Sequence, residues 1–218
     1  MKKYKIIIPK YVVPITVLAI ALNILRFVLF GKLTLIYILW NIILAFIPYI
    51  ISSFLFVYSK EEKVNKLLFI SGFILWLLFI PNAPYIITDF IHLGDTRSIP
   101  LLFDIIMLFS STVIGLVFFC RSLFHIEQII KTKYSYKTTS LIMGFIILLI
   151  SFGIFLGRFL RFNSWDIFIN HLSIIKNVWK VFTEPSGGVG VYFYTLLFFF
   201  FLIVVYRTYK ILNIKSIN

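Results

Sequence analysis

The sequence predicts an all-α protein, a polytopic helix bundle that crosses a membrane about six times. Of its 218 residues 61% are hydrophobic and only 13% are charged, whereas a soluble domain is about 45–50% apolar and about 25% charged. The apolar residues also gather into six runs, each near the length of about 20 residues that a spanning helix needs. These runs leave no room for a separate soluble module, so we interpret residues 1–218 as one integral membrane domain.

The six predicted spans follow the apolar runs. By residue number they cover 11–30, 33–58, 67–91, 101–120, 139–157 and 191–208. The first run follows Lys2, Lys3 and Lys5, as in a signal peptide, but it continues past Ala21 to Phe30. We therefore interpret it as an uncleaved signal anchor.

The basic residues predict the orientation. With the N-terminus in the cytoplasm, fourteen of the 21 Lys and Arg residues fall on the cytoplasmic side and seven on the other. This bias satisfies the positive-inside rule, and six spans return the C-terminus to the cytoplasm. Because the basic residues lie in short runs between spans, the net charge of +13 indicates the lipid bilayer as partner and not nucleic acid.

The third span is predicted to break in the outer half of the membrane. Pro81 and Pro84 cannot both lie in an unbroken helix, since each removes a donor and clashes one turn back. Downstream, Thr88, Asp89 and His92 would share one face of an α-helix. An Asp and a His so placed can form an acid/base couple or bind a divalent metal. The alternative is a proline kink followed by a polar cap at the interface.

The outer end of the fifth span carries a second polar segment. Arg158 and Arg161 are three residues apart, so in a continuing helix both guanidinium groups point the same way and suit a phosphate or carboxylate. Further polar or interfacial groups follow at Asn163, Ser164, Trp165 and Asp166. The alternative is an Arg/Trp anchor belt.

Three further features complete the outer side. Asp104 lies one turn inside span four, where a lone carboxylate is costly, so we expect it to pair with Arg26, Arg158 or Arg161. An amphipathic helix is predicted to lie on the outer surface and cover the site. Its apolar stripe is Phe168, Leu172, Ile175, Val178, Trp179 and Phe182. The spacing of Gly153 and Gly157 allows close helix approach within the monomer or in a homo-oligomer.

The two polar segments, 78–93 and 157–166, closely resemble the strongest motifs of a bacterial membrane protein family, domain of unknown function 1361. Asp104 also fits the pattern, and the similarity covers about residues 35–210. Phe162 stands where we expect Trp in this family, which keeps an aromatic ring. The resemblance implies a multi-pass protein of the bacterial cytoplasmic membrane and cell envelope, but it implies no reaction.

These observations lead to one leading hypothesis and two alternatives. The two segments are expected to close on one extracytoplasmic polar site that handles an anionic lipid or lipid-linked envelope substrate. Asp89, His92 and Asp166 are the candidate catalytic residues, with Asp89 and His92 as ligands if a divalent metal binds. The candidate substrate-binding residues are Asn82, Tyr85, Thr88, Asp104, Arg158, Arg161, Asn163, Ser164 and Trp165. The alternatives are a small transporter or channel, and a non-catalytic accessory protein, so enzyme activity is left open.

Overall fold

The protein is described from a computed structural model, which describes residues 12–31, 36–93, 100–164, 166–169, 171–183 and 185–215. Within these ranges the chain is helical and has no strands. Six of the described segments are long and apolar enough to cross a membrane. The predicted fold class is therefore confirmed, and the molecule is a multi-pass membrane protein.

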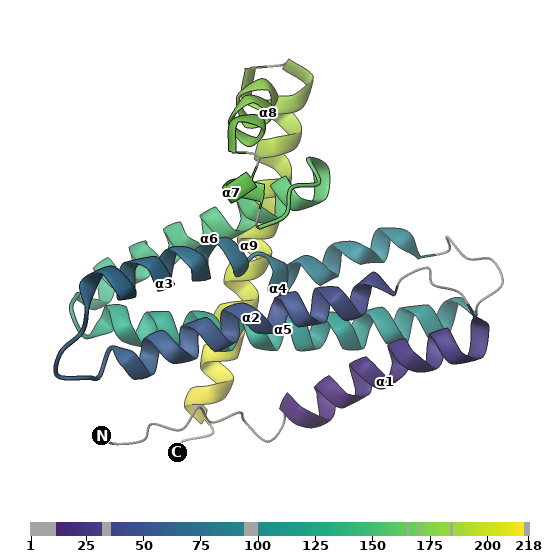
Figure 1. The fold of residues 1–218 in the computed structure, drawn as a ribbon, viewed down its shortest axis with the longest axis horizontal. Helices are drawn as coiled ribbons and strands as arrows, with labels where there is room; N and C mark the ends of the chain where they lie inside the picture. Colours follow the sequence, from purple (N-terminus) through teal and green to yellow (C-terminus); the bar gives the residue numbers. More distant parts are fainter. Residues whose placement is uncertain are drawn as a thin grey trace. The chain divides into compact units, whose positions relative to one another are not determined.

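The chain divides into two compact units, Met1–Ile129 and Ile130–Asn218, and each is described by itself. The helices of the first unit are α1 (Val12–Phe30), α2 (Tyr37–Tyr58), α3 (Lys66–Phe79), α4 (Asn82–Tyr85), the 3-10 helix η1 (Ile86–His92) and α5 (Leu101–Lys131). Those of the second are α6 (Tyr136–Phe159), α7 (Asp166–Ile169), α8 (His171–Thr183) and α9 (Pro185–Lys215). Figure 1 shows these elements along the chain. The prediction of a single domain stays a prediction.

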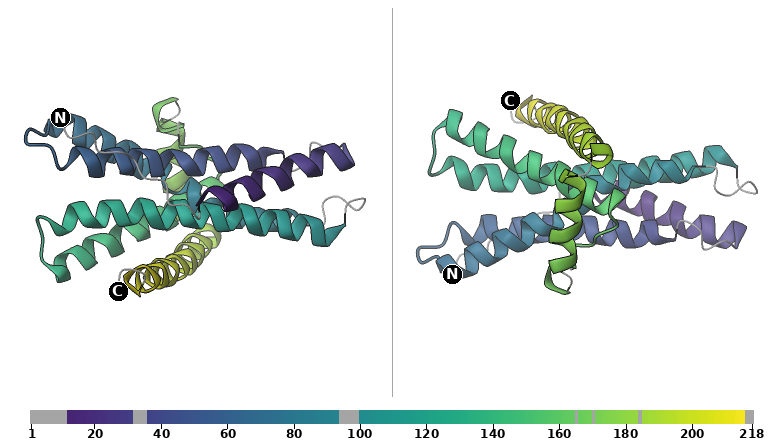
Figure 2. Two further views of the ribbon diagram at one scale, coloured as in Figure 1. Left: turned by 90° about the horizontal axis from the view of Figure 1, so that it is seen from below. Right: turned by 90° about the horizontal axis from the view of Figure 1, so that it is seen from above.

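In the first unit, a chain of hydrogen bonds joins α2, α3 and α5 through fully buried side chains. The indole Nε1 of Trp76 donates to Ser122 Oγ at 2.7 Å, and that hydroxyl donates to the carbonyl of Pro48 at 3.1 Å. Helices α2 and α3 lie side by side (Figure 2). Because a hydroxyl and an indole N–H are costly to bury unpaired, these bonds fix how the three helices meet.

Helix α5 is longer than the span predicted over 101–120, because it continues to Lys131. The added turns bury Ser122 and Glu127. A run of 20 apolar residues sets the minimum for a span and does not mark where the helix stops. The sequence from Arg121 onward has no Gly or Pro before Lys131 to end it.

In the second unit, α6 packs against α9, and α8 also contacts α9 (Figure 1). Helix α6 begins at Tyr136 because Ser135 caps it, its hydroxyl accepting the N–H of Thr138 at 3.4 Å. Among the longer helices that the structure describes, α8 is the most amphipathic, as the predicted apolar stripe requires. Its place on a membrane surface stays a prediction.

Candidate functional site

The predicted break in the third span is present. Helix α3 ends at Phe79, a single α-helical turn follows as α4, and the chain then tightens into η1. This irregular stretch is pressed against α5 at Gly115, where a Cβ would collide with the carbonyl oxygen of Ala83 and lie 3.1 Å from Ile86 Cδ1. The absence of a side chain at Gly115 therefore lets the broken segment approach α5 closely.

The 3-10 geometry changes which side chains share a face, so the predicted trio is wrong in one member. A 3-10 helix has three residues per turn, and side chains three apart eclipse. Asp89 and His92 therefore share a face, whereas Thr88 does not lie on it. The hydroxyl of Thr88 instead donates to the carbonyl of Tyr85 at 2.7 Å, so it satisfies the local backbone.

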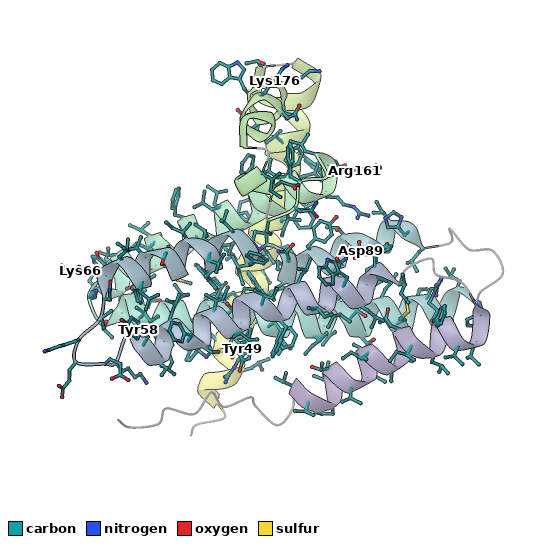
Figure 3. The ribbon with its side chains drawn as sticks, in the orientation of Figure 1. Tyr49, Tyr58, Lys66, Asp89, Arg161 and Lys176 are labelled. Atoms are coloured by element: carbon teal, nitrogen blue, oxygen red, sulfur yellow. The ribbon has the colours of Figure 1, made fainter. Side chains whose placement is uncertain are left out.

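Asp89 is fully buried and is held by a residue that the sequence analysis missed. Asn41 of α2 donates from Nδ2 to Asp89 Oδ2 at 2.9 Å, and Figure 3 labels Asp89 on the stretch that follows the break. One turn before Asn41, the ring of Tyr37 meets the ring of His92 edge-on at 6.0 Å. A polar Asn within an apolar span is the signal that could have found this contact.

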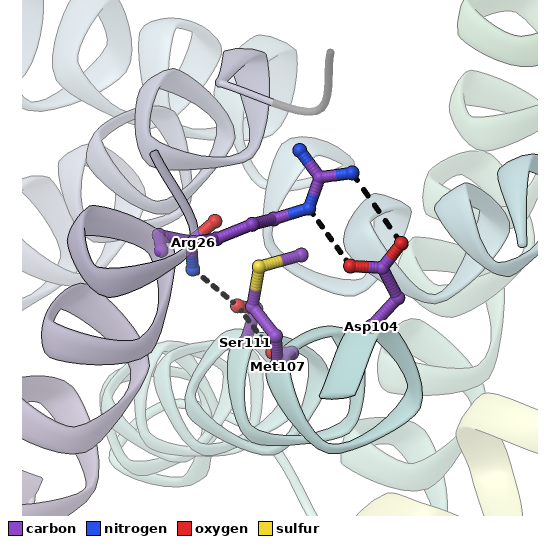
Figure 4. Close-up of polar contacts among 5 residues, drawn as sticks. Arg26, Asp104, Met107 and Ser111 are labelled. Atoms are coloured by element: carbon purple, nitrogen blue, oxygen red, sulfur yellow. Dashed lines mark hydrogen bonds and ion pairs between the residues drawn. The ribbon is translucent and has the colours of Figure 1, made fainter. Parts of the chain in front are cut away.

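Asp104 is paired, and its partner is Arg26 of α1. The guanidinium donates from Nε to Oδ1 at 2.8 Å and from Nη2 to Oδ2 at 3.3 Å (Figure 4). Both side chains are almost wholly buried. On the same side of α1, Asn23 donates to Ser111 Oγ at 3.1 Å. The predicted pairing of Asp104 with an arginine is thus confirmed, and its two carboxylate oxygens are engaged by this fork.

The expectation that Arg158 and Arg161 project from one continuing helix is wrong. Helix α6 ends at Phe159, and Arg161 has a left-handed backbone with φ 57°. The N–H groups of Leu160 and Phe162 both donate to the carbonyl of Leu156, at 3.1 and 3.3 Å. Those bonds satisfy a carbonyl group at the end of α6 and reverse the chain, so the two arginines have different backbone conformations.

The side chain of Arg161 is exposed, and the backbone around it has a conformation that can bind anions. A right-handed residue followed by a left-handed one forms a concave nest of N–H groups that can bind anions. Leu160 and Arg161 have this sequence of conformations. The nest is filled by the carbonyl of Leu156. Among the described residues, no hydrogen bond or ion pair holds the Arg161 side chain.

Asp166 stabilises the far end of the same turn. Its carboxylate Oδ2 accepts the backbone N–H of Asn163 at 2.7 Å and the side-chain amide at 3.3 Å, while its own N–H donates to the Asn163 carbonyl at 3.0 Å. The carboxylate thus reaches back to the N–H three residues earlier, as the acidic residue of a capping box does. The geometry gives Asp166 a positioning role, and its predicted catalytic role stays a prediction. Ser164 is half-buried, and Trp165 lies outside the described residues.

The remaining predicted residues lie at the helix break. Asn82 donates from Nδ2 to the carbonyl of Phe79 at 3.0 Å, which closes the end of α3, and Tyr85 ends α4. Across the described residues there is no group of three or more His, Cys, Asp or Glu side chains that could hold a metal ion. Asp89 and His92 would supply two ligands, which by themselves are fewer than a structural metal site uses.

The described helices define a multi-pass membrane protein with buried polar side chains at a broken span. The chain belongs to the family described as Protein of unknown function (DUF1361), whose sequence model matches residues 40–205. The match includes the helix break, α5 and the turn at Arg161, and leaves α1 outside. Comparisons with curated proteins and with solved structures gave no match.

Proposed function

We propose that this protein binds an anionic group, the phosphate of a lipid or of a lipid-linked envelope precursor, at the extracytoplasmic face of a bacterial cytoplasmic membrane. The observation that carries the proposal is the left-handed backbone of Arg161. A residue with a Cβ costs about 1–2 kcal/mol in this conformation, and Gly is the usual residue at such a helix end. An arginine kept at this position at that cost points to a use for its side chain.

The chemistry of the turn fits a phosphate. A guanidinium group presents a planar fork of donors that matches two phosphate oxygens, which the point charge of a lysine cannot do. The turn that carries Arg161 is held at one end by the bonds to Leu156 and at the other by the bonds between Asn163 and Asp166. A fixed turn reduces the conformational entropy lost on binding.

The proposed orientation rests on charge. The exposed connection after α2 includes Lys60 and Lys63, and the positive-inside rule assigns it to the cytoplasm together with both termini. The turn at Arg161 then lies outside. On the same side, Asp89 is proposed as an acid/base group, or with His92 as a ligand of a divalent metal.

The experiment compares two lipids that differ by one group. The purified protein in nanodiscs is titrated with a polyprenyl monophosphate and with the matching polyprenol, and binding is measured by native mass spectrometry. The protein should bind the phosphate at least tenfold more tightly than the alcohol. Equal binding of both lipids would contradict the proposal.

Two substitutions of Arg161 separate binding from folding. Arg161→Gly removes the guanidinium, so it should lower the affinity for phosphate. It also removes the strain of the left-handed backbone, so the free energy of unfolding should rise by about 1 kcal/mol. Arg161→Lys keeps the charge and loses the fork, so its affinity should fall between those of wild type and Arg161→Gly. If Arg161→Gly binds as tightly as wild type, Arg161 is not the anion-binding group.

A small transporter is the second candidate, because the third span is broken at α4 and η1 and because α5 buries Glu127 in its last turns. Broken spans and buried ionisable groups occur in substrate and ion pathways. To test this candidate, radiolabelled inorganic phosphate is added outside sealed proteoliposomes that are loaded with buffer, and uptake is measured. Uptake above that of empty liposomes would favour transport, whereas binding without uptake would favour the proposed extracytoplasmic binding site.

A further inference from the structure

A row of aromatic rings runs along α6 toward the turn that carries Arg161. Phe152, Phe155 and Phe159 lie three and four residues apart, so they share one face of this helix. The ring centroids of Phe152 and Phe155 are 6.4 Å apart, and those of Phe155 and Phe159 are 5.0 Å apart. Both pairs are stacked. Because Phe159 is the last residue of α6, the row ends just before Arg161 in the sequence.

Helix α9 adds a fourth ring to this row. The centroid of the Tyr194 ring lies 4.3 Å from that of Phe159, and Phe193 meets Tyr194 edge-on at 5.3 Å. Both helices belong to the second unit, in which α6 packs against α9 (Figure 1). We refer to Phe152, Phe155, Phe159 and Tyr194 as the aromatic row.

The aromatic row is open to a ligand at the end next to Arg161. Phe159 is 45% exposed and Tyr194 is half-buried, whereas Phe155 is almost wholly buried. Phe155 therefore fixes the row within the packing of the second unit. Phe159 and Tyr194 present ring surface that no other described part of this unit covers.

The order of groups along α6 matches the order of groups in a lipid phosphate. The four rings lie within two segments that are long and apolar enough to span a membrane, Tyr136–Phe159 and Gly190–Leu212. Arg161 lies just beyond the end of the first. A phosphate at Arg161 therefore has hydrocarbon beside the rings, whereas a sugar would have to leave water to reach them.

Contact with fixed rings can distinguish one lipid chain from another. A chain is surrounded by hydrocarbon whether it is bound or free, so burial from water gives no preference, and van der Waals packing decides. Phe and Tyr side chains offer a large contact area and lose little conformational entropy. Because the rings of α6 follow one another in single file, they provide contact for one chain and not for two.

An isoprenoid chain suits such a row better than a saturated chain. Each isoprene unit contains a double bond, so the chain has fewer freely rotating bonds and loses less conformational entropy when it is held along a surface. Its flat double bonds can also stack on aromatic rings, as flat apolar groups do.

We propose that the lipid phosphate bound at Arg161 carries a single isoprenoid chain, and that Phe159 and Tyr194 bind the part of the chain next to the phosphate. This inference rests on the proposed function, which supplies the phosphate at Arg161. It adds the class of the chain and two residues that select it.

The first test compares chains that carry the same kind of headgroup. The purified protein in phosphatidylcholine nanodiscs is titrated with a polyprenyl monophosphate, with a two-chain phosphatidic acid and with the matching polyprenol, and native mass spectrometry measures binding. Wild type should bind the polyprenyl monophosphate about three- to tenfold more tightly than phosphatidic acid, which is the gain expected from an aromatic contact.

The second test removes the rings one at a time. Phe159→Leu and Tyr194→Leu should each lower the affinity for the polyprenyl monophosphate by about three- to tenfold and leave that for phosphatidic acid unchanged. Tyr194→Phe keeps the ring and should bind as wild type does. Phe145→Leu is the matched control, because Phe145 is an exposed ring elsewhere on α6, and it should change neither affinity.

The outcomes separate this inference from the proposed function. If both phosphates bind more tightly than the polyprenol but equally well, phosphate binding at Arg161 stands and the isoprenoid assignment is overturned. The assignment is also overturned if the two Leu variants weaken both phosphates alike, or if Tyr194→Phe loses as much affinity as Tyr194→Leu. If neither phosphate binds more tightly than the polyprenol, the proposed function itself fails.

Discussion

Arg26 Nε and Asp104 Oδ1 lie 2.8 Å apart, in side chains that are only 2% and 3% exposed. This pair joins α1, which lies outside the family match, to the first turn of α5, which lies within it. Two opposite charges buried together satisfy each other, whereas either one alone would be left without compensation in an apolar environment. The pair therefore makes α1 part of the first unit.

We expect loss of one partner to cost far more than loss of both. Asp104→Leu or Arg26→Met alone should lower the free energy of unfolding by about 3–5 kcal/mol, whereas the double variant should lie within about 1 kcal/mol of wild type. Reversible unfolding in mixed micelles gives the three values. Asn23→Leu is the control, because it removes the neighbouring hydrogen bond to Ser111 and changes no charge. Additive single effects in the double variant would contradict the coupling.

The contact between Asn41 and Asp89 allows an exchange of the carboxylate. Asp89→Asn removes the charge but keeps a polar pair, so the protein should fold, while a general base lost from η1 would lower activity by about 10²–10⁴-fold. Asn41→Asp/Asp89→Asn restores one carboxylate and one amide in reversed positions. The measurements are the amount of inserted protein and the rescue of a deletion strain.

The reversed pair should keep insertion and stability and leave function lost, because the carboxylate now sits on α2. If the reversed pair also rescues the deletion strain, the position of the carboxylate does not matter, and Asp89 has only a structural role.

Gly115→Ala should destabilise the first unit. The new Cβ would collide with the carbonyl oxygen of Ala83, a backbone atom that cannot rotate away, and overpacking of this kind costs about 1–3 kcal/mol. Gly144→Ala is the matched control, since nothing lies within 4 Å of its added Cβ and Ala is favoured over Gly in a helix by about 1 kcal/mol. Thermal unfolding should move the two variants in opposite directions. Equal Tm values would show that α4 can shift away from α5.

The proposed topology can be tested with single cysteines, because Cys120 is the one cysteine in the sequence. In a Cys120→Ala background, Lys63→Cys and Lys133→Cys should react with a membrane-impermeant maleimide only after the inner face is opened. Lys176→Cys should react in intact cells, since α8 is expected outside. Labelling of Lys176→Cys from the cytoplasmic side alone would reverse the map and move the proposed anion site with it.

The sequence was sufficient for the spans and for the broken helix. Apolar runs identify spans because a bilayer requires about 20 apolar residues in a row. Pro81 and Pro84 locate the break because neither residue can donate a backbone hydrogen bond. The need of Asp104 for an arginine followed from the cost of an unpaired charge in the membrane. These inferences depend on local chemistry, which a sequence states directly.

The residues that the sequence analysis misplaced depend on three-dimensional contacts. The left-handed conformation of Arg161 follows from how the end of α6 bonds to Leu156, and no Gly marks it in the sequence. Thr88 left the predicted face because η1 has the period of a 3-10 helix. Asn41 lies 48 residues before Asp89, so their contact exists only once α2 and η1 meet. The assignment of both polar segments to one site stays a prediction.

The contact between Arg26 and Asp104 also sets an order of events during synthesis. The two residues are 78 positions apart, and at about 5–20 residues per second the ribosome reaches Asp104 about 4–16 s after Arg26. For that interval α1 carries an arginine without its carboxylate partner, which is costly inside a membrane span. We therefore expect α1 to stay beside the translocation channel until α5 emerges. A crosslinker on α1 in stalled ribosome complexes should capture the channel when the chain ends before Asp104, and α5 once the chain extends well beyond it.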